Sequence, residues 1–487
     1  MVSKEQLKQF EQFDFQDILN FIQSEYKDQN AFCYFNPKEG KWVNVSTKQF
    51  AEDARRVASY IQKRFGKGNN IVISSVNTYA YVCMTFGIAI SGNVVAPLDR
   101  NKPLDQTLQS MKMIDSSIAL FESDNVLKNV PNDGGTYLTL QAAFEEAMTY
   151  DIDFEYEKDA KRAAIILATS GVTNNPKYVV LSQSNLIYGA LNGMYRLPID
   201  KGYKALSILP LSHVFENCCG LVYPLLTGGT IVQNDSPVNI KANIELHQPN
   251  FIVAVPSLIV TFNRLYHAEM MMKGSSCLSS VKYIIGGGAK VPPSAIKDFY
   301  ENGIYVIQGY GLTETAASVA MNSATEITFD TVGNPMHFSD VKIVNEEILV
   351  KCPDVMLGYY KNPEATKAAF DGEYLKTGDT GYLDEKGNLV ILGRLKNVII
   401  FPTGEKVYPE EVEERIQANP GIDYCKVYDT NGLVTADIFS ASLNKEQVEA
   451  IIAKYNETAY KIQVIKKLNV LSELPPVTAL GKPFRRG

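Results

Sequence analysis

Histidine and closely spaced cysteines are scarce in this chain of 487 residues. The four histidines stand far apart at positions 213, 247, 267 and 337. The seven cysteines are odd in number and scattered, without the CxxC spacing of a zinc or redox motif: Cys33, Cys83, Cys218, Cys219, Cys277, Cys352 and Cys425. A zinc site is therefore poorly supported, and reduced thiols are expected.

Long apolar runs and an excess of basic residues are also absent. The most apolar helix-like run, Tyr79 to Ile90, is well short of the about 20 residues that cross a bilayer, so it predicts a buried helix and no transmembrane segment. The opening MVSKEQLKQFEQFDF has no basic head followed by an apolar stretch, which indicates a cytoplasmic protein. A net charge of -7 argues against nucleic acid as a partner and favours small molecules.

Alternating strand-like and helix-like segments fill the middle of the chain. Between about Ala164 and Gln308, short β-branched runs such as AIILA, FIVAV and VKYII alternate with amphipathic stretches. This pattern predicts an α/β fold in which helices cover parallel sheets. Ligands of such folds bind at the carboxyl ends of the strands, where this sequence has polar loops. The four loops are TSGVTNNPK, PLSHVFEN, GGGAK and GYGLTET.

The chain is too long for one core, because single cores stop growing near roughly 250 to 300 residues. From Ile327 to Leu392, short strands and turns predict a small β-rich module. After GRLKN, two helix-like segments (408–419 and 444–457) and two strand-like segments (424–429 and 434–441) predict a compact α+β unit. We expect a large domain over residues 1–394 and a small domain over residues 395–487.

The stretch LATSGVTNNPK, residues 167–177, has nearly the spacing of a phosphate-binding P-loop. Pro176 has no backbone N–H and Tyr178 is a poor magnesium ligand, so the P-loop interpretation is weak. What remains is a turn rich in hydroxyls and backbone donors, followed by Lys177 as a mobile charge. This composition suits a polyphosphate, although a plain Ser/Thr-rich surface turn has the same composition.

Four ordered stretches resemble the adenylate-forming superfamily, which includes acyl-CoA synthetases, luciferases and the adenylation domains of peptide synthetases. They are TSGVTNNPKYVVLSQSNL, GYGLTET (309–315), LKTGDTGYLDEKGNLVILGRLKN (375–397) and the terminal GKPFRRG. GYGLTET matches the family without change, whereas Val172, Asn174 and Tyr178 depart from the first motif. PLSHVFEN is most similar to the long-chain fatty acid-CoA ligases, with Asn217 in place of their arginine.

The resemblance implies a site for ATP and Mg²⁺. Tyr310 would pack on the adenine, Thr313 would contact the α-phosphate, and Asp379 and Arg394 would hold the ribose. Glu314 and Thr169 would bind magnesium, and these two with Lys482 would be the catalytic residues. An aromatic face, a hydroxyl and a hard oxygen ligand suit those roles. The full ATP-binding set would be Thr169, Ser170, Gly171, Thr173, Lys177, Gly288, Ala289, Gly309, Tyr310, Gly311, Leu312, Thr313, Asp379, Arg394 and Lys482.

The resemblance also implies positions for the acid and the thiol. The acid would be bound by His213, Gly286, Gly287 and Gly311. The pantetheine of coenzyme A would pass Gly404, Glu405 and Lys406, and the small domain would rotate about a hinge at Asn397. A lone histidine after a strand is more often a packed residue than a catalyst, so we assign His213 no acid-base role.

The implied reaction is activation of a carboxylic acid by ATP to an acyl adenylate, followed by transfer to coenzyme A. An apolar acid, fatty or aryl, fits the sequence best, because the region of PLSHVFEN has no FD motif for pairing a substrate ammonium. Glu216 could pair with such an ammonium instead. Two alternatives stay open: an enzyme that loads the phosphopantetheine of an acyl carrier protein, and a weakly active nucleotide-binding regulatory protein. The second is prompted by Val172, Asn174 and Tyr178.

Overall fold

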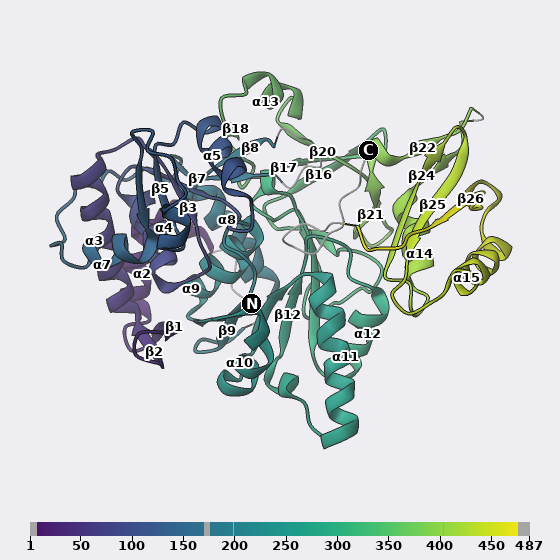
Figure 1. Ribbon diagram of the computed structural model, residues 1–487, viewed down its shortest axis with the longest axis horizontal. Helices are drawn as coiled ribbons and strands as arrows, with labels where there is room; N and C mark the ends of the chain where they lie inside the picture. Colours follow the sequence, from purple (N-terminus) through teal and green to yellow (C-terminus); the bar gives the residue numbers. More distant parts are fainter. Residues whose placement is uncertain (1–6, 170–175, 198, 403, 476–487) are drawn as a thin grey trace.

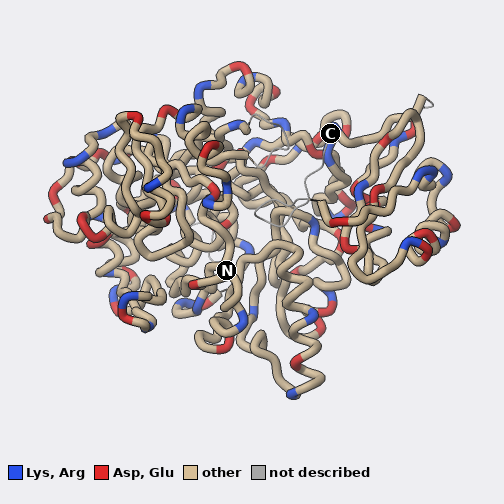
Figure 2. The backbone as a smooth tube through the Cα atoms, viewed as in Figure 1, with Lys and Arg blue, Asp and Glu red and all other residues tan. Residues whose placement is uncertain are grey.

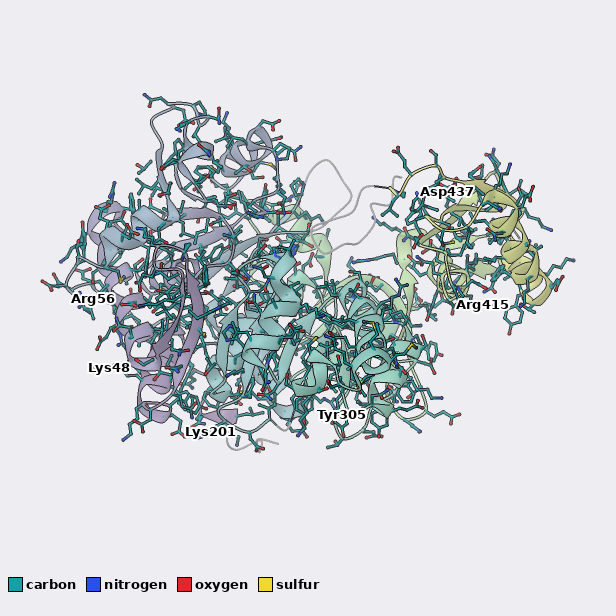
Figure 3. All side chains as sticks on the ribbon, turned by 60° about the horizontal axis from the view of Figure 1, so that its bottom comes forward. Lys48, Arg56, Lys201, Tyr305, Arg415 and Asp437 are labelled. Atoms are coloured by element: carbon teal, nitrogen blue, oxygen red, sulfur yellow. The ribbon has the colours of Figure 1, made fainter. Side chains whose placement is uncertain are left out.

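The computed structural model describes residues 7–169, 176–197, 199–402 and 404–475. In Figure 1 the chain begins in a purple and blue body at one end and continues into a teal body in the middle. Green strands follow, and the yellow C-terminal segment lies at the other end of the molecule. Figure 3 shows the same arrangement from another side, with Arg415 and Asp437 on the yellow segment and Lys48 and Arg56 on the purple one.

A seven-stranded sheet forms the core of the first body, in the order β18-β8-β7-β4-β3-β5-β6. Neighbours from β7 to β6 pair in parallel, and β8 and β18 add antiparallel edges. Their bounds are β3 Asn70–Ser74, β4 Val94–Pro97, β5 Ile118–Phe121, β6 Thr136–Thr139, β7 Ala163–Ala168, β8 Tyr178–Ser182 and β18 Gly358–Tyr359. The predicted strand AIILA is therefore β7.

A nine-stranded sheet forms the middle body, in the order β15-β14-β13-β12-β11-β9-β10-β1-β2. The strands from β13 to β1 are parallel, while β2, β14 and β15 pair antiparallel. Their bounds are β1 Asn30–Asn36, β2 Lys41–Ser46, β9 Lys204–Ser207, β10 Thr230–Gln233, β11 Phe251–Ala254, β12 Tyr283–Gly286, β13 Tyr305–Tyr310, β14 Ala320–Met321 and β15 Asn334–Pro335.

The expected α/β class is confirmed, but the path of the chain differs in one place. The sequence suggested that AIILA passes directly to a helix, whereas β8 intervenes and pairs antiparallel with β7. The β-branched run in YVVLS gives β8 its strand propensity. As a result, β7 belongs to a different sheet from β9, β12 and β13. The four polar loops therefore come from two sheets.

Helices cover both sheets. The apolar run Tyr79–Ile90 is α4, and every one of its residues is buried, as expected. Thr78 caps its start by accepting from the N–H of Tyr81. The remaining helices of these bodies are α2 Phe15–Glu25, α3 Thr47–Phe65, α5 Leu104–Met113, α6 Asp124–Leu127, α7 Leu140–Ala147, α8 Gln183–Arg196, α9 Tyr223–Thr227, α10 Ile240–His247, α11 Pro256–Lys273 and α12 Pro293–Glu301.

The predicted β-rich module is a five-stranded sheet in which β17 and β20 are central. Its strands are antiparallel, as short strands joined by tight turns allow. The bounds are β16 Asp340–Val344, β17 Glu347–Lys351, β19 Phe370–Asp371, β20 Tyr374–Leu383 and β21 Leu389–Arg394, with the helix α13 Pro363–Ala369 before β19.

The C-terminal segment has a hydrophobic core of its own, formed by buried residues between Ile399 and Ile465. The two predicted helices are α14 Pro409–Gln417 and α15 Lys445–Thr458, and Asn444 with Gln447 forms the expected capping box. The strands are β22 Ile399–Ile400, β23 Lys406–Val407, β24 Tyr424–Thr430, β25 Leu433–Phe439 and β26 Lys467–Val470. The boundary between residues 394 and 395 stays a prediction.

Surface charge is mixed. Figure 2 shows Lys and Arg interspersed with Asp and Glu over the face in view. Within the described residues, no helix is long and apolar enough to span a bilayer.

Candidate active site

The motif GYGLTET lies at the carboxyl end of β13 and continues into a short 3₁₀ turn at Thr313–Thr315. Gly311 is required there, because a Cβ atom at this position would lie 2.2 Å from the backbone carbon of Ala317. The chain thus doubles back closely after Gly311, which a side chain would prevent. All residues from Gly309 to Glu314, including Leu312, are partly exposed, so the motif presents its surface to solvent.

Asp379 joins two of the predicted motifs. Its carboxylate accepts a hydrogen bond from the Tyr310 hydroxyl at 2.6 Å and pairs with the Arg394 Nε at 3.0 Å. Asp379 is buried and Arg394 is more exposed. Burial beside this carboxylate raises the pKa of Tyr310 well above its ordinary value, so the phenol stays a donor. The structure therefore brings together the three side chains for which the resemblance implied adenine and ribose contacts.

Glu314 is held by a residue that the sequence did not single out. Its Oε1 accepts from the Tyr359 hydroxyl at 2.9 Å, and the Lys177 Nζ lies 4.6 Å from the centre of the Tyr359 ring. The backbone N–H of Met356 donates to the Glu314 carbonyl at 2.8 Å. Lys177 and Glu314, which are 137 positions apart in the numbering, therefore meet on one aromatic side chain.

The glycine- and hydroxyl-rich loop leaves β7 and returns as β8. The Thr169 N–H donates to the Lys177 carbonyl at 2.9 Å, so the two ends of the loop close on each other. Ser170, Gly171 and Thr173 lie outside the described residues, as does Lys482. Tyr178, which departs from the family motif, is buried as the first residue of β8 and contributes to the core of this sheet.

His213 lies in the loop after β9, and other polar side chains hold that loop. The Asn77 amide donates to the Leu209 carbonyl at 2.7 Å and its oxygen accepts from the Leu211 N–H at 2.9 Å. Asn217, the departure from the fatty acyl motif, donates to the carbonyls of Leu211 and His213 at 2.6 and 2.9 Å. At the position where the fatty acyl motif has an arginine, the Asn217 amide therefore closes this loop.

The His213 imidazole is held in its neutral form. Burial lowers its pKa most, and Lys102 lowers it further while Asp99 opposes the shift. Its Nε2 atom is buried and has no hydrogen-bond partner among the described residues. A neutral imidazole with one unpaired ring nitrogen can accept or donate one hydrogen bond to a bound group.

Glu216 begins a π-helical segment, Glu216–Val222, and is fully buried. Its Oε1 accepts from the Ser207 hydroxyl at 2.5 Å, and burial raises its pKa to about 8. A carboxyl that is protonated at neutral pH does not supply the charge that an ammonium group needs. The idea that Glu216 pairs with a substrate amine therefore loses its electrostatic basis.

The GGGAK loop follows β12 and packs against the segment that carries His213. A Cβ atom on Gly287 would lie 2.9 Å from the Phe215 ring, and one on Gly286 would lie 2.9 Å from both Ile259 and Val291. Both glycines are buried, whereas Gly288 and Ala289 are exposed beyond them. The first two glycines of the motif thus pack in the core, and the residues after them lie on the surface.

The apolar helix after Pro256 is α11, and its apolar side turns inward. Ile259, Phe262 and Tyr266 are buried in the core of the nine-stranded sheet. This packing accounts for their apolar character without a ligand, so the helix gives less information about the acid than its sequence suggested.

The segment after Arg394 links the large body to the C-terminal strands. The Asn397 amide donates to Glu410 Oε1 at 2.7 Å, and Lys290 pairs with Glu414 at 2.6 Å. Gly404 and Glu405 are exposed in the β22–β23 turn. Lys406 instead pairs with Glu346 at 2.6 Å, beside the β16–β17 turn.

Magnesium fits the residues assigned to it in chemical type. Glu314 supplies a carboxylate and Thr169 a hydroxyl, which are the hard oxygen ligands that this ion prefers. Both side chains are partly exposed, and no ion pair reaches Glu314 from any described cation. The single group of His, Cys, Asp and Glu side chains close enough to hold a metal in the described ranges is Glu245, Glu269 and Cys277, which belong to other elements.

The chain is similar to known proteins both in sequence and in fold. The model of the AMP-binding enzyme family matches residues 22–360. The 2-succinylbenzoate–CoA ligase of Bacillus subtilis is 27% identical over 395 residues, 77% of each chain. The long-chain-fatty-acid–CoA ligase FadD15 of Mycobacterium bovis is 24% identical over 477 residues, which span 83% of this chain and 78% of that enzyme. The crystal structure of the anthranilate CoA ligase AuaEII with anthranoyl-AMP superposes with a TM-score of 0.84 and 17% identity, covering 97% of this chain and 96% of that one.

Proposed function

The chain belongs to the AMP-binding enzyme family, and on that premise we propose that it joins an apolar carboxylic acid to coenzyme A. It is an AMP-forming acyl-CoA synthetase that uses ATP, Mg²⁺ and coenzyme A and passes through an acyl adenylate. We also propose that the enzyme is cytoplasmic.

The contacts of Asp379 with Tyr310 and Arg394 are the main support for the residue roles that we propose. Tyr310 and Arg394 come from separate motifs, yet both contact the same buried carboxylate beside the GYGLTET loop. A carboxylate at the base of a polar loop can accept hydrogen bonds from two neighbouring hydroxyls, as the ribose of ATP presents. Tyr310 adds an aromatic ring to this group of contacts. We assign the nucleoside of ATP to these three residues.

Positive charge must then be supplied for the phosphates, because a carboxylate attacking the α-phosphorus is one anion approaching another. Lys177 and Lys482 are assigned to the phosphates, with Thr169 and Thr313 as hydroxyl donors. Glu314 and Thr169 would hold magnesium, which would supply positive charge for the pyrophosphate. Binding and orientation by these groups lower the barrier without an enzymic nucleophile.

The acid is assigned to the space near His213, Gly287 and Gly311. His213 is neutral and partly buried, and Glu216 is protonated and paired with Ser207, so neither places a fixed charge there. Because these two residues supply no fixed charge to pair with a second charged group on the acid, the site suits an aliphatic or aryl tail. Curated relatives of this chain are named for 2-succinylbenzoate, which carries two carboxylates, and for long-chain fatty acids, which carry one. The site that we propose favours an acid of the second kind, with a single carboxylate.

The thiol step needs a second arrangement, in which pantetheine reaches the adenylate past Gly404, Glu405 and Lys406. We propose that residues 395–487 rotate about Asn397 between the two steps, a hinge motion of known type. The Lys406–Glu346 and Lys290–Glu414 ion pairs are at the boundary that such a rotation would open.

A product assay tests this function. The enzyme is incubated with ATP, Mg²⁺ and a panel of acids that includes fatty, aryl and 2-succinylbenzoic acids, with free coenzyme A and a holo acyl carrier protein in the same reaction. Mass spectrometry should detect an acyl-CoA from at least one apolar acid. Acylation of the carrier protein alone would support the carrier-loading alternative. No acylated product from any acid would favour the regulatory alternative.

A further inference from the structure

Tyr359 lies where three separated parts of the site meet. It is the second residue of β18, which pairs with β8 directly after Lys177, so that Tyr359 is opposite Val179. The strand is fixed on its other side, since the Tyr359 N–H donates to the Thr366 hydroxyl at 2.9 Å. Strand pairing and this hydrogen bond therefore hold the backbone of Tyr359 in place.

The ring and the hydroxyl of Tyr359 act on two different residues. The ring receives the Lys177 ammonium at 4.6 Å from its centre, within the range of a cation–π interaction. The hydroxyl donates to Glu314 Oε1 at 2.9 Å. The preceding Met356 binds the backbone carbonyl of Glu314, so one short segment holds this residue at both ends.

From this geometry we propose that Tyr359 is a positioning residue that orients the Glu314 carboxylate toward the metal and Lys177 toward the phosphates. A free glutamate side chain samples many rotamers, and fixing it in one of them costs conformational entropy. A hydroxyl donor removes much of that cost before ligand arrives, and it leaves Oε2 without a hydrogen bond or ion pair from any described side chain. The inference rests on the proposed function, because it assigns Glu314 to magnesium.

The neighbouring Tyr360 provides a matched control. Its hydroxyl makes two polar contacts, with Asp115 Oδ2 and the Asn70 amide, both at 2.9 Å. Those partners are part of the seven-stranded sheet and its loops, away from Glu314. Replacing either tyrosine with phenylalanine removes one hydroxyl, but only Tyr359→Phe removes the contact to Glu314.

The first measurement is binding of the non-reactive analogue α,β-methylene ATP, by calorimetry with and without Mg²⁺. Mg²⁺ should tighten binding in the wild type, and Tyr359→Phe should reduce that enhancement roughly tenfold, since hydrogen bonds to charged groups have such magnitudes. Tyr360→Phe should keep the wild-type enhancement. Tyr359→Leu, which also removes the ring, should in addition weaken binding of the analogue without Mg²⁺.

The second measurement starts from synthetic acyl adenylate and coenzyme A. This half-reaction follows release of pyrophosphate, so Tyr359→Phe should run it within about twofold of the wild type, as expected for a role limited to the polyphosphate. Equal losses in both half-reactions would indicate a merely structural role and overturn the proposal. So would an unchanged Mg²⁺ enhancement in Tyr359→Phe.

Two results separate this inference from the proposed function. If the wild type does not bind the analogue, the proposed function fails. If the wild type binds it with a Mg²⁺ enhancement that Tyr359→Phe retains, only the role of Tyr359 fails. A Glu314→Gln background tests whether Tyr359 acts through Glu314, because Tyr359→Phe should have little further effect on the enhancement once the carboxylate is absent.

Discussion

Burial changes the pKa of single side chains in this protein, and Glu216 allows that effect to be measured. Its pKa is raised from 4.5 to about 8, so the folded chain holds a proton that the unfolded chain releases above pH 4.5. Stability from this group is therefore lost as pH rises between those values, by about 1.4 kcal/mol per pH unit. Glu216→Gln should flatten the decline of unfolding free energy between pH 5.5 and 7.5, measured by denaturant titration.

Asp354 serves as a comparison for this effect. It is also fully buried, and its pKa is raised to about 7, so its contribution has the same sign but ends at a lower pH. Asp354→Asn should flatten the stability curve mainly below pH 7. If Glu216→Gln leaves the slope above pH 7 unchanged, the carboxyl is ionised in the folded protein and our description of its environment is wrong.

Gly311 allows a second test at the residue scale. A methyl group there meets the backbone of Ala317 at 2.2 Å, whereas a methyl group on Gly309 meets only ordinary contacts from 3.4 Å outward. Gly311→Ala should destabilise the chain by about 1 to 3 kcal/mol, as overpacking against backbone does. Gly309→Ala should cost distinctly less. Equal unfolding free energies for the two variants would contradict the close approach.

At the element scale, α8 and the approach to β18 are tied by Asn185. This residue completes the capping box with Ser182, and its amide also donates to the carbonyls of Pro353 and Val355. Asn185→Ala should therefore cost more stability than Ser182→Ala, for which loss of the cap gives about 1 kcal/mol. Thermal unfolding of the two variants compares them. A larger loss for Ser182→Ala would show that the link to β18 contributes little.

The same scale shows what the sequence could predict. Helix α4 and the capping box of α15 follow from an apolar run and from Asn444 with Gln447, so their local signals were sufficient. Strand β8 was missed although YVVLS has strand propensity, because the alternating pattern paired AIILA directly with the next helix. Strand β18 has two residues and no periodicity, so the position of Tyr359 depends on pairing with a strand far away in sequence.

Some residues of the candidate site could also be predicted from the sequence, and others could not. GYGLTET and Asp379 were identified because their residue types and order match a known family. Asn77 and Tyr359 were missed, since a lone asparagine or tyrosine has no local pattern that indicates its partner. Their roles arise from contacts with Leu209, Leu211 and Glu314, which only the fold brings near.

At the scale of the whole molecule, the C-terminal segment should fold alone. Residues 399–470 enclose their own core, and the contacts with the large body are polar pairs such as Lys290–Glu414. Polar boundaries of this kind allow relative motion of domains. A fragment of residues 395–487 should therefore unfold cooperatively on heating, as followed by circular dichroism. A flat, unfolded spectrum would contradict the proposed boundary.

Convergence of distant loops on one nucleotide is the central claim, and acid-dependent exchange of labelled pyrophosphate into ATP tests it directly. At least one apolar acid should support exchange by the full-length enzyme. Lys482→Ala should slow that exchange by roughly 100-fold or more, because we assign the charge of Lys482 to the reacting phosphate. Exchange by Lys482→Ala at the wild-type rate, or no exchange with any acid, would contradict the account.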